Sequence, residues 1–226
     1  MALPRSPAVP CLALLALSLA LGAGCEPATD IGDAGIGSGP DGGADGGADA
    51  GCPDYPSAPY DWDLDDVVDR VTFPAMYGSD GPITALDMCD VLADADTVKA
   101  LVFVIGTTTC PYCPARFTEI GEMDLAAYGA EKVAVYYDDA TGDASLDPAS
   151  VSAIADTYGW IGGWRISDTA DKTIFYGGYP NWLWQTTPNV FIVDTHSMMI
   201  VAAEKGASPT LLDVLAEVQA IDAANP

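Results

Sequence analysis

The most informative stretch of this chain is LVFVIGTTTCPYCPARF, residues 101–117. It opens with a continuous run of apolar β-formers, which is typical of a strand buried on both faces of a sheet. Gly106 and three threonines end the run, and Cys110 and Cys113 follow with two residues between them. A helix is predicted from about Pro111 to Tyr128. The cysteine pair therefore lies at the junction between a buried strand and a helix.

A cysteine at this junction is chemically activated, because unpaired backbone N–H groups and the helix dipole stabilise a thiolate there. Pro111 fits the first turn of the helix, where no N–H donor is needed. The pair could instead be half of a zinc site, but a structural zinc needs four ligands. The only histidine, His196, is interpreted as a turn residue, and the remaining cysteines lack the spacing of a second ligand pair. We therefore expect redox chemistry without a metal or another cofactor.

The rest of the chain supplies further strands and helices. Strands are predicted around Val67–Phe73, over Val133–Tyr137, within Trp160–Ser167, and over Asn189–Asp194 and Met198–Ala203. Helices are predicted within Ile83–Ala95 with Asp87 as cap, over Pro148–Tyr158 with Asp147 as cap, and from Ser208 or Thr210 onward with Leu211, Leu212, Leu215 and Val218 on one face. The first buried strand, its helix and the next strand form a right-handed β-α-β unit.

The order of strand, CPYC, helix and strand resembles the thioredoxin-like superfamily. Thr187-Pro188 strengthens the resemblance, because in that superfamily a cis-proline lies beside the CxxC motif and the backbone before it pairs with substrate. Pro188 could be an ordinary proline at a strand entry, but the resemblance favours the cis form. From about Val67 to Ala220 the layout is similar to the TlpA/ResA/redoxin branch, with an insert over residues 140–185. The resemblance implies an α/β thioredoxin-like fold, in which helices flank a central mixed β-sheet.

The resemblance also implies roles for individual residues. Cys110 would be the exposed nucleophile, and Cys113, one helical turn further and more buried, would resolve the mixed disulfide. The substrate-binding residues would be Tyr112, Thr187, Pro188 and Trp184. Trp184 belongs to an aromatic group with Tyr176, Tyr179 and Trp182. This group could wall a peptide groove, or it could be core of the insert, and the sequence leaves both interpretations open.

Three positions depart from the family pattern. Thr109 replaces the tryptophan that usually precedes the first cysteine, and Val104 stands near the place of the family's buried acid. Arg116, interpreted as a surface helix residue, replaces the glutamate that ResA-like proteins carry three residues after the second cysteine. These departures leave open whether the pair reduces or oxidises its substrates.

The N-terminal residues 1–24 have the features of a signal peptide. They carry one basic residue, Arg5, followed by an apolar run over Cys11–Leu21. That run is too short for a membrane-spanning helix, which needs about 20 apolar residues. Gly22-Ala23-Gly24-Cys25 resembles the lipobox of bacterial lipoproteins, which implies that Cys25 is lipidated and becomes the new N-terminus. An ordinary secreted protein with a free Cys25 is the alternative.

Residues 25–51 are rich in Gly, Ala and Asp and cannot bury enough apolar surface to fold, so we predict a disordered tether. Residues 52–226 then form the thioredoxin-like domain. The chain contains 33 acidic and 8 basic residues and has a net charge of −25. This charge argues against nucleic acid and against an anionic membrane surface as partners. We expect a lipoprotein on the periplasmic side of a bacterial membrane, held at the outer membrane by its lipid anchor only.

Cys52 and Cys89 remain once the CxxC pair, the lipobox Cys25 and Cys11 of the signal peptide are set aside. Export brings the protein into an oxidising compartment, where a structural disulfide between them would pin the lead-in segment to the domain. A second redox pair and two free thiols are the alternatives.

The expected function is that of a thiol–disulfide oxidoreductase. Its substrates would be protein thiols or disulfides in the periplasm, and it would need a redox partner that the sequence does not identify. A thiol peroxidase is one alternative: Thr107 stands three residues before Cys110, as in peroxiredoxins, although Phe103 replaces a proline of that family. A binding module that keeps the fold without catalysis is the other alternative, and the two intact cysteines argue against it.

Overall fold

The computed structural model describes residues 52–57, 59–137, 147–168, 174, 186–206, 208 and 210–226. The predictions for the signal peptide, the tether, Cys25 and the aromatic group that includes Trp184 lie outside these residues. Within them, no helix is long and apolar enough to cross a membrane.

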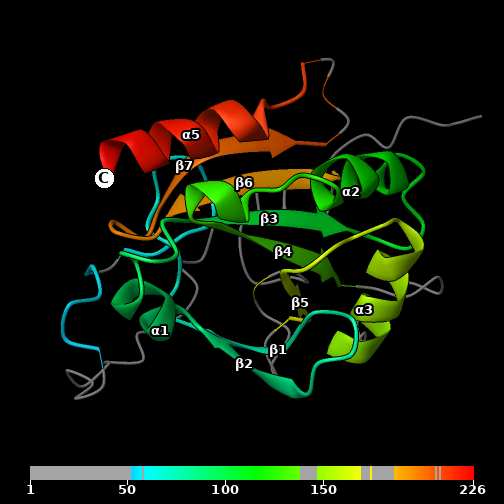
Figure 1. Ribbon diagram of the computed structural model, residues 1–226, viewed down its shortest axis with the longest axis horizontal. Coiled ribbons are helices and arrows are strands. Elements are labelled where there is room, and N and C mark those ends of the chain that lie inside the picture. The colour runs from blue at the N-terminus through cyan, green and yellow to red at the C-terminus, as the bar shows by residue number, and fades with distance from the viewer. Residues whose placement is uncertain are drawn as a thin grey trace, which may run out of the picture. The chain divides into compact units, whose positions relative to one another are not determined.

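The described residues form an α/β structure (Figure 1). In chain order its elements are β1 (Thr72–Tyr77), β2 (Ile83–Asp87), α1 (Met88–Ala93), β3 (Ala100–Gly106), α2 (Cys113–Gly121), the 3-10 turn η1 (Ala126–Tyr128), β4 (Ala130–Tyr136), α3 (Pro148–Thr157), β5 (Trp164–Ile166), β6 (Asn189–Asp194), β7 (Met199–Lys205) and α5 (Val214–Ala224).

The strands form one mixed sheet in the order β2-β1-β5-β4-β3-β6-β7. β4 pairs in parallel with both β3 and β5, and the remaining pairs are antiparallel. β3 lies between β4 and β6, and all seven of its residues are buried. The sequence prediction of a strand buried on both faces is therefore confirmed.

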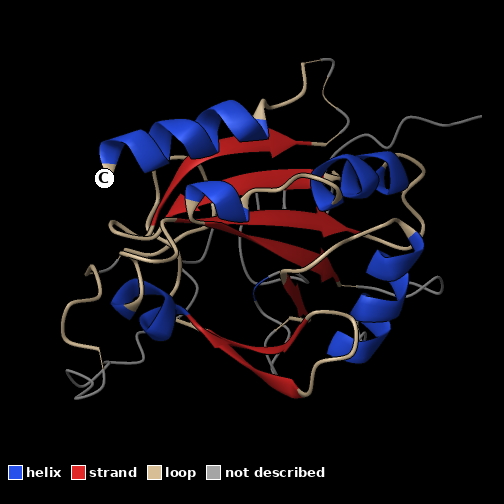
Figure 2. Ribbon diagram, in the orientation of Figure 1, coloured by secondary structure: helices blue, strands red, loops and turns tan. Residues whose placement is uncertain are grey.

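Two apolar cores lie on opposite faces of this sheet, and helices flank it (Figure 2). α2, α3 and α5 contribute to the core that also contains the CPYC cysteines. The other core is covered by α1 and by the lead-in segment, residues 52–69. The sheet thus separates the cysteine pair from the part of the chain that closes the opposite face.

Several local predictions are confirmed. The strands after the CPYC helix and after Pro188 form as β4 and β6, and β6 turns back into β7 as an antiparallel hairpin. Asp147 caps α3 by accepting a hydrogen bond from the backbone N–H of Ser150 at 2.7 Å. Asp87 likewise caps α1 by accepting from the backbone N–H of Cys89 at 2.8 Å.

The prediction at the start of the domain was wrong in two places. Val67 forms only isolated bridges, to Tyr60 and Met199, and the strand itself begins at Thr72. Ile83–Asp87 leads into the expected helix, α1, but itself forms a strand that was not predicted, β2, because the turn over residues 78–82 lets it pair antiparallel with β1. Strand pairing across the turn overrides the local pattern.

The helix predicted over Pro111–Tyr128 is also shorter than expected. α2 ends at Gly121, and the separate turn η1 precedes Gly129, whose backbone is left-handed (φ 67°). The buried amine of Lys132 donates hydrogen bonds to the carbonyls of Gly121 and Met123. A continued helix would need these carbonyls as acceptors for its own N–H groups.

The last helix begins later than predicted, at Val214, where Asp213 caps it by accepting from the N–H of Ala216. Its buried face consists of Val214, Val218 and Ile221. Leu211 and Leu215, which were expected on that face, are 54% and 37% exposed.

The lead-in segment is held by two aromatic side chains. Trp62 is fully buried, with its ring 5.4 Å from that of Phe191 and 5.8 Å from that of Phe103. Tyr55 donates its hydroxyl proton toward the backbone carbonyls of Val68 and Asp69, at 3.1 and 3.3 Å. Both contacts are noncovalent, and they hold the segment against the domain.

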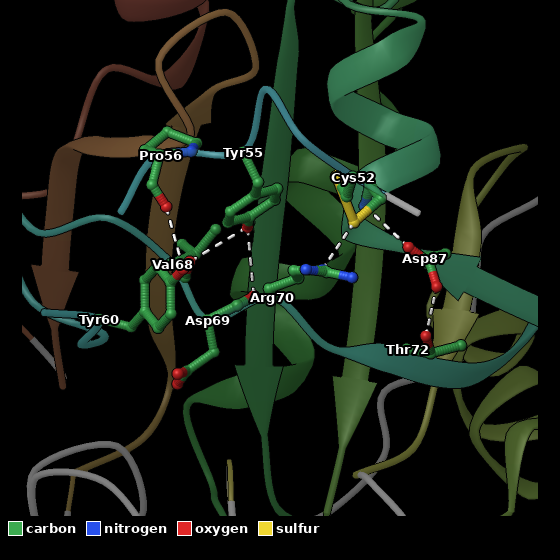
Figure 3. The surroundings of a disulfide bond; sticks show 10 residues. Cys52, Tyr55, Pro56, Tyr60, Val68, Asp69, Arg70, Thr72 and Asp87 are labelled. Atoms are coloured by element: carbon green, nitrogen blue, oxygen red, sulfur yellow. Dashed lines mark hydrogen bonds between the residues drawn. A yellow bond between two sulfur atoms is a disulfide. The ribbon is translucent and has the colours of Figure 1, made fainter. Parts of the chain in front are cut away.

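A disulfide joins Cys52 in this segment to Cys89 at the start of α1, with Cα atoms 5.8 Å apart (Figure 3). The guanidinium of Arg70 donates a hydrogen bond from Nε to the sulfur of Cys89 at 3.1 Å. We propose that this bridge is structural. It closes a loop of 37 residues, so its main effect is on the unfolded chain.

Replacing both cysteines (Cys52→Ala with Cys89→Ala) should lower the free energy of unfolding by roughly 3–4 kcal/mol while leaving the native circular dichroism spectrum unchanged. The fold persists because Tyr55 and Trp62 still anchor the lead-in. Urea denaturation measures the loss. The Cys110→Ala, Cys113→Ala double variant is the control and should lose less, because its bridge spans only three positions. An equal or smaller loss in the Cys52/Cys89 variant would contradict a structural role.

Candidate active site

The candidate site lies where β3 ends and α2 begins. Cys110 and Cys113 form a disulfide there, with Cα atoms 5.5 Å apart. Cys113 is the first residue of α2 and is fully buried, whereas Cys110 precedes the helix and is 9% exposed. Cys110 is therefore the more accessible residue of the pair.

The outer sulfur takes the place of a helix cap. Tyr112 is the residue before α2 but its side chain makes no capping bond. Instead the backbone N–H of Cys113 donates to Sγ of Cys110 at 3.0 Å. The proline in the first turn of α2 is Pro114, not Pro111 as predicted, because the helix begins two residues later than expected. A helix N–H aimed at the sulfur would stabilise a thiolate after reduction.

Gly106 lets the inner cysteine pack against the end of β3. A Cβ at this position would lie 2.9 Å from a ring carbon of Phe117 and 3.1 Å from Sγ of Cys113. Both distances are shorter than ordinary van der Waals contact, so a side chain at this position would displace Phe117 or Cys113. Behind Phe117 lies the ring of Tyr136, 4.5 Å away, and burial raises the pKa of that phenol, which stays neutral.

The structure brings Pro188 to the same end of the sheet as the cysteines. The Thr187–Pro188 peptide bond is cis, and β6 begins at the next residue. β6 runs antiparallel to β3 with Asn189 opposite Ile105, so the start of β6 adjoins the end of β3. Pro188 is buried and Thr187 is partly exposed. His196 follows the other end of β6, in a turn beside Asp96, away from the cysteines.

A buried ion pair near the cysteines was not predicted. Arg116 on α2 was expected at the surface but is 3% exposed, and it donates from Nη2 to the Glu204 carboxylate at 2.8 Å. Glu204 on β7 is 4% exposed. It pairs with Val190 of β6, which pairs in turn with Val104 of β3. Glu204 thus places a buried carboxylate on the same face of the sheet as Val104, two strands away.

The sequence held only a weak signal for this pair. Glu204 is the one acid in the strand MIVAAEK, residues 199–205. Standing next to Lys205 near the end of the strand, it looks like part of a solvent-exposed terminus. Only the register of β7 on β6 shows that its side chain faces α2.

A groove of about 440 Å³, here called the Tyr112–Leu211 groove, extends to Tyr112, which lies between the two cysteines in the sequence. It is lined by Tyr112, Ala115, Arg116, Glu119, Pro188, Glu204, Gly206, Ser208 and Leu211. Of the predicted substrate-binding residues, the structure brings Tyr112 and Pro188 together in this groove. The side chain of Asn189 accepts the backbone N–H of Gly206 at 2.9 Å and so fixes the end of the β6–β7 hairpin that borders it.

A scan against protein-family models found no match, and a search of curated proteins found no relative. Among solved structures, the mitochondrial 2-Cys peroxiredoxin from Plasmodium falciparum is 14% identical with a TM-score of 0.50, over 71% of this chain and 93% of that one. A hypothetical protein from Sinorhizobium meliloti 1021 is 19% identical with a TM-score of 0.50, over 72% and 86% of the two chains. At these identities the likeness shows a shared fold alone.

The packing at Gly106 generates a stability prediction. Gly106→Ala should lower the free energy of unfolding by about 1–3 kcal/mol, because the new methyl group overpacks the contact between β3 and α2. Urea denaturation under reducing conditions measures the effect.

The same substitution in a Cys113→Ala background is the control. Its cost should be smaller there, because one of the two clashing neighbours has been removed. A Gly106→Ala protein as stable as the parent would show that the close approach is not needed.

Proposed function

We propose that this protein, whose fold is that of the thioredoxin-like superfamily, is a thiol–disulfide oxidoreductase acting through Cys110 and Cys113. The observation that carries the proposal is the arrangement of the pair: a disulfide at the end of β3 whose outer sulfur accepts an N–H of α2, beside cis-Pro188. This arrangement presents one sulfur to a partner and shields the other.

In the reducing direction the thiolate of Cys110 attacks one sulfur of a substrate disulfide. The substrate S–S bond breaks, the second substrate sulfur leaves as a thiolate and takes a proton, and Cys110 is held in a mixed disulfide. Cys113 then loses its proton and attacks Sγ of Cys110. The intramolecular disulfide forms and the first substrate sulfur leaves as a thiol. In the oxidising direction the same steps run backwards.

The burial of the two cysteines supports these roles. Cys110 meets the substrate because it is the more accessible sulfur, and Cys113 can reach only Cys110 because it is enclosed by Gly106 and Phe117. Resolution is fast because the attacking sulfur of Cys113 and the attacked sulfur of Cys110 are held next to each other.

The assignment is tested by trapping. Cys113→Ser should accumulate mixed disulfides with partner proteins, because resolution is blocked, whereas Cys110→Ser should trap none and should reduce insulin no faster than the uncatalysed reaction. Non-reducing electrophoresis of cells that express each variant measures the adducts. Cys52→Ser with Cys89→Ser is the control and should keep insulin reduction. Equal trapping by the two single variants would contradict the roles.

The same assays separate the alternative functions. Consumption of hydrogen peroxide without reduction of insulin would indicate a thiol peroxidase. Peptide binding with neither activity would indicate a binding module.

We further propose that the protein acts outside the cytoplasm as a lipoprotein. The support is the short apolar run that ends at Gly22-Ala23-Gly24-Cys25 and the Gly/Asp-rich stretch that follows. A lipid on Cys25 would hold the domain at a membrane, and the stretch over residues 25–51 would let it reach partners.

Expressed with its signal sequence in a Gram-negative host, the protein should sediment with membranes, and Cys25→Ser should release it in soluble form. Membrane fractionation and labelling with a radioactive fatty acid measure anchoring. Cys11→Ser, within the apolar run, is the matched control and should leave anchoring intact. Recovery of the unaltered protein in the soluble fraction would overturn the anchor.

A further inference from the structure

The walls of the Tyr112–Leu211 groove are unusually apolar for an exposed surface. Tyr112, between the two cysteines, is 62% exposed, and Leu211 is 54% exposed. Ala115 is exposed and adds apolar surface, and the buried Pro188 also lines the groove. An apolar side chain inserted there would remove its own surface and that of both walls from water, which is the main source of affinity at such sites.

The wall formed by Leu211 is held in place by the buried ion pair. Nη2 of Arg116 donates to the backbone carbonyl of Leu212 at 2.8 Å, and the carboxylate of Glu204 accepts the backbone N–H of the same residue at 2.6 Å. Both peptide groups of Leu212 are thus clamped between α2 and β7. Leu211 therefore has a fixed position relative to Cys110 before any ligand arrives, which lowers the entropy lost on binding.

The charge in the groove is negative. Among its described residues, the ionisable side chains are Arg116, Glu119 and Glu204. Arg116 and Glu204 neutralise each other below the surface, whereas the side chain of Glu119 is 45% exposed and also accepts from Nη1 of Arg116 at 2.7 Å. One carboxylate is therefore in excess at the rim, on a chain of net charge −25. Such a rim favours a cationic ligand and repels an anionic one.

We propose that the Tyr112–Leu211 groove selects substrates by the sequence beside their reacting cysteine: an apolar side chain that enters between Tyr112 and Leu211, next to a lysine or arginine that pairs with Glu119. This inference rests on the proposed exchange at Cys110 and Cys113. It makes Leu211 and Glu119 the residues that determine specificity, and it makes basic polypeptide segments with an apolar residue at the cysteine the preferred substrate class.

The test uses the reduced full-length protein and synthetic peptides whose single cysteine forms a mixed disulfide with thionitrobenzoate, so that exchange releases a coloured thiol. Four peptides combine Leu or Ser next to the cysteine with Lys or Glu at the following position. Stopped-flow absorbance gives second-order rate constants at low and high salt. Hydroxyethyl disulfide, small and uncharged, reports the activity of the cysteine pair without the groove.

We expect the Leu-Lys peptide to react at least tenfold faster than the Ser-Glu peptide at low salt. Leu211→Ser should reduce the preference for Leu over Ser to within twofold, and Glu119→Gln should do the same to the preference for Lys over Glu, which high salt also weakens. Leu64→Ser and Glu122→Gln are the matched controls. Both residues are exposed and lie outside the groove, so both variants should keep both preferences.

The outcomes separate the two proposals. If the unaltered protein fails to reduce hydroxyethyl disulfide, the proposed function itself is wrong. If it reduces this probe but treats the four peptides alike, or if Leu211→Ser and Glu119→Gln keep the preferences of the parent, the groove does not select substrates and the inference is overturned. Circular dichroism and the urea midpoint show that each variant is folded, and the preferences are ratios of rate constants within one variant, so a uniform change in the reactivity of the cysteine pair does not affect them.

Discussion

α2 approaches the end of β3 so closely that residue 106 has room for no side chain. The inner sulfur of the cysteine pair and the ring of Phe117 occupy the space that a Cβ would need. This contact buries Cys113 at the start of the helix and leaves Cys110 outside it, where a helix N–H meets its sulfur. The different burial of two chemically identical cysteines, on which the proposed reaction depends, follows from this one contact.

The second constraint is the burial of Arg116 and Glu204. Two charges removed from water are costly unless each finds a partner and further hydrogen bonds. Here the guanidinium and the carboxylate meet each other and also hold both peptide groups of Leu212. The pair thereby joins α2, β7 and the segment before α5, three elements that border the groove beside the cysteines. The ion pair is thus a buried polar link on the face of the sheet that α2 covers. It fixes the position of the segment that forms one wall of the Tyr112–Leu211 groove.

The two faces of the sheet hold different groups of stabilising contacts. The face with α2, α3 and α5 holds the cysteine pair and the ion pair. On the opposite face lie the aromatic cluster around Trp62 and the Cys52–Cys89 disulfide, which closes the lead-in over α1. Because β3 and its neighbours are buried between the two cores, the Cys110–Cys113 disulfide is separated from the contacts that hold the lead-in.

Signals confined to one segment were sufficient to predict the centre of the sheet and the position of the cysteine pair between a strand and a helix. The apolar runs of β3, β4 and β6, the cap at Asp147 and the cysteine pair before a helix can each be recognised within about ten residues. The fold class followed from their order, and it is confirmed. β2, the early end of α2 and the late start of α5 were not predicted, because each depends on a contact with another element and not on its own residues. These contacts are made by β1, by Lys132 and by the Arg116–Glu204 pair. Only the tertiary structure places Glu204 beside Arg116, 88 positions apart, because strand register and helix packing decide which polar side chains share a buried space.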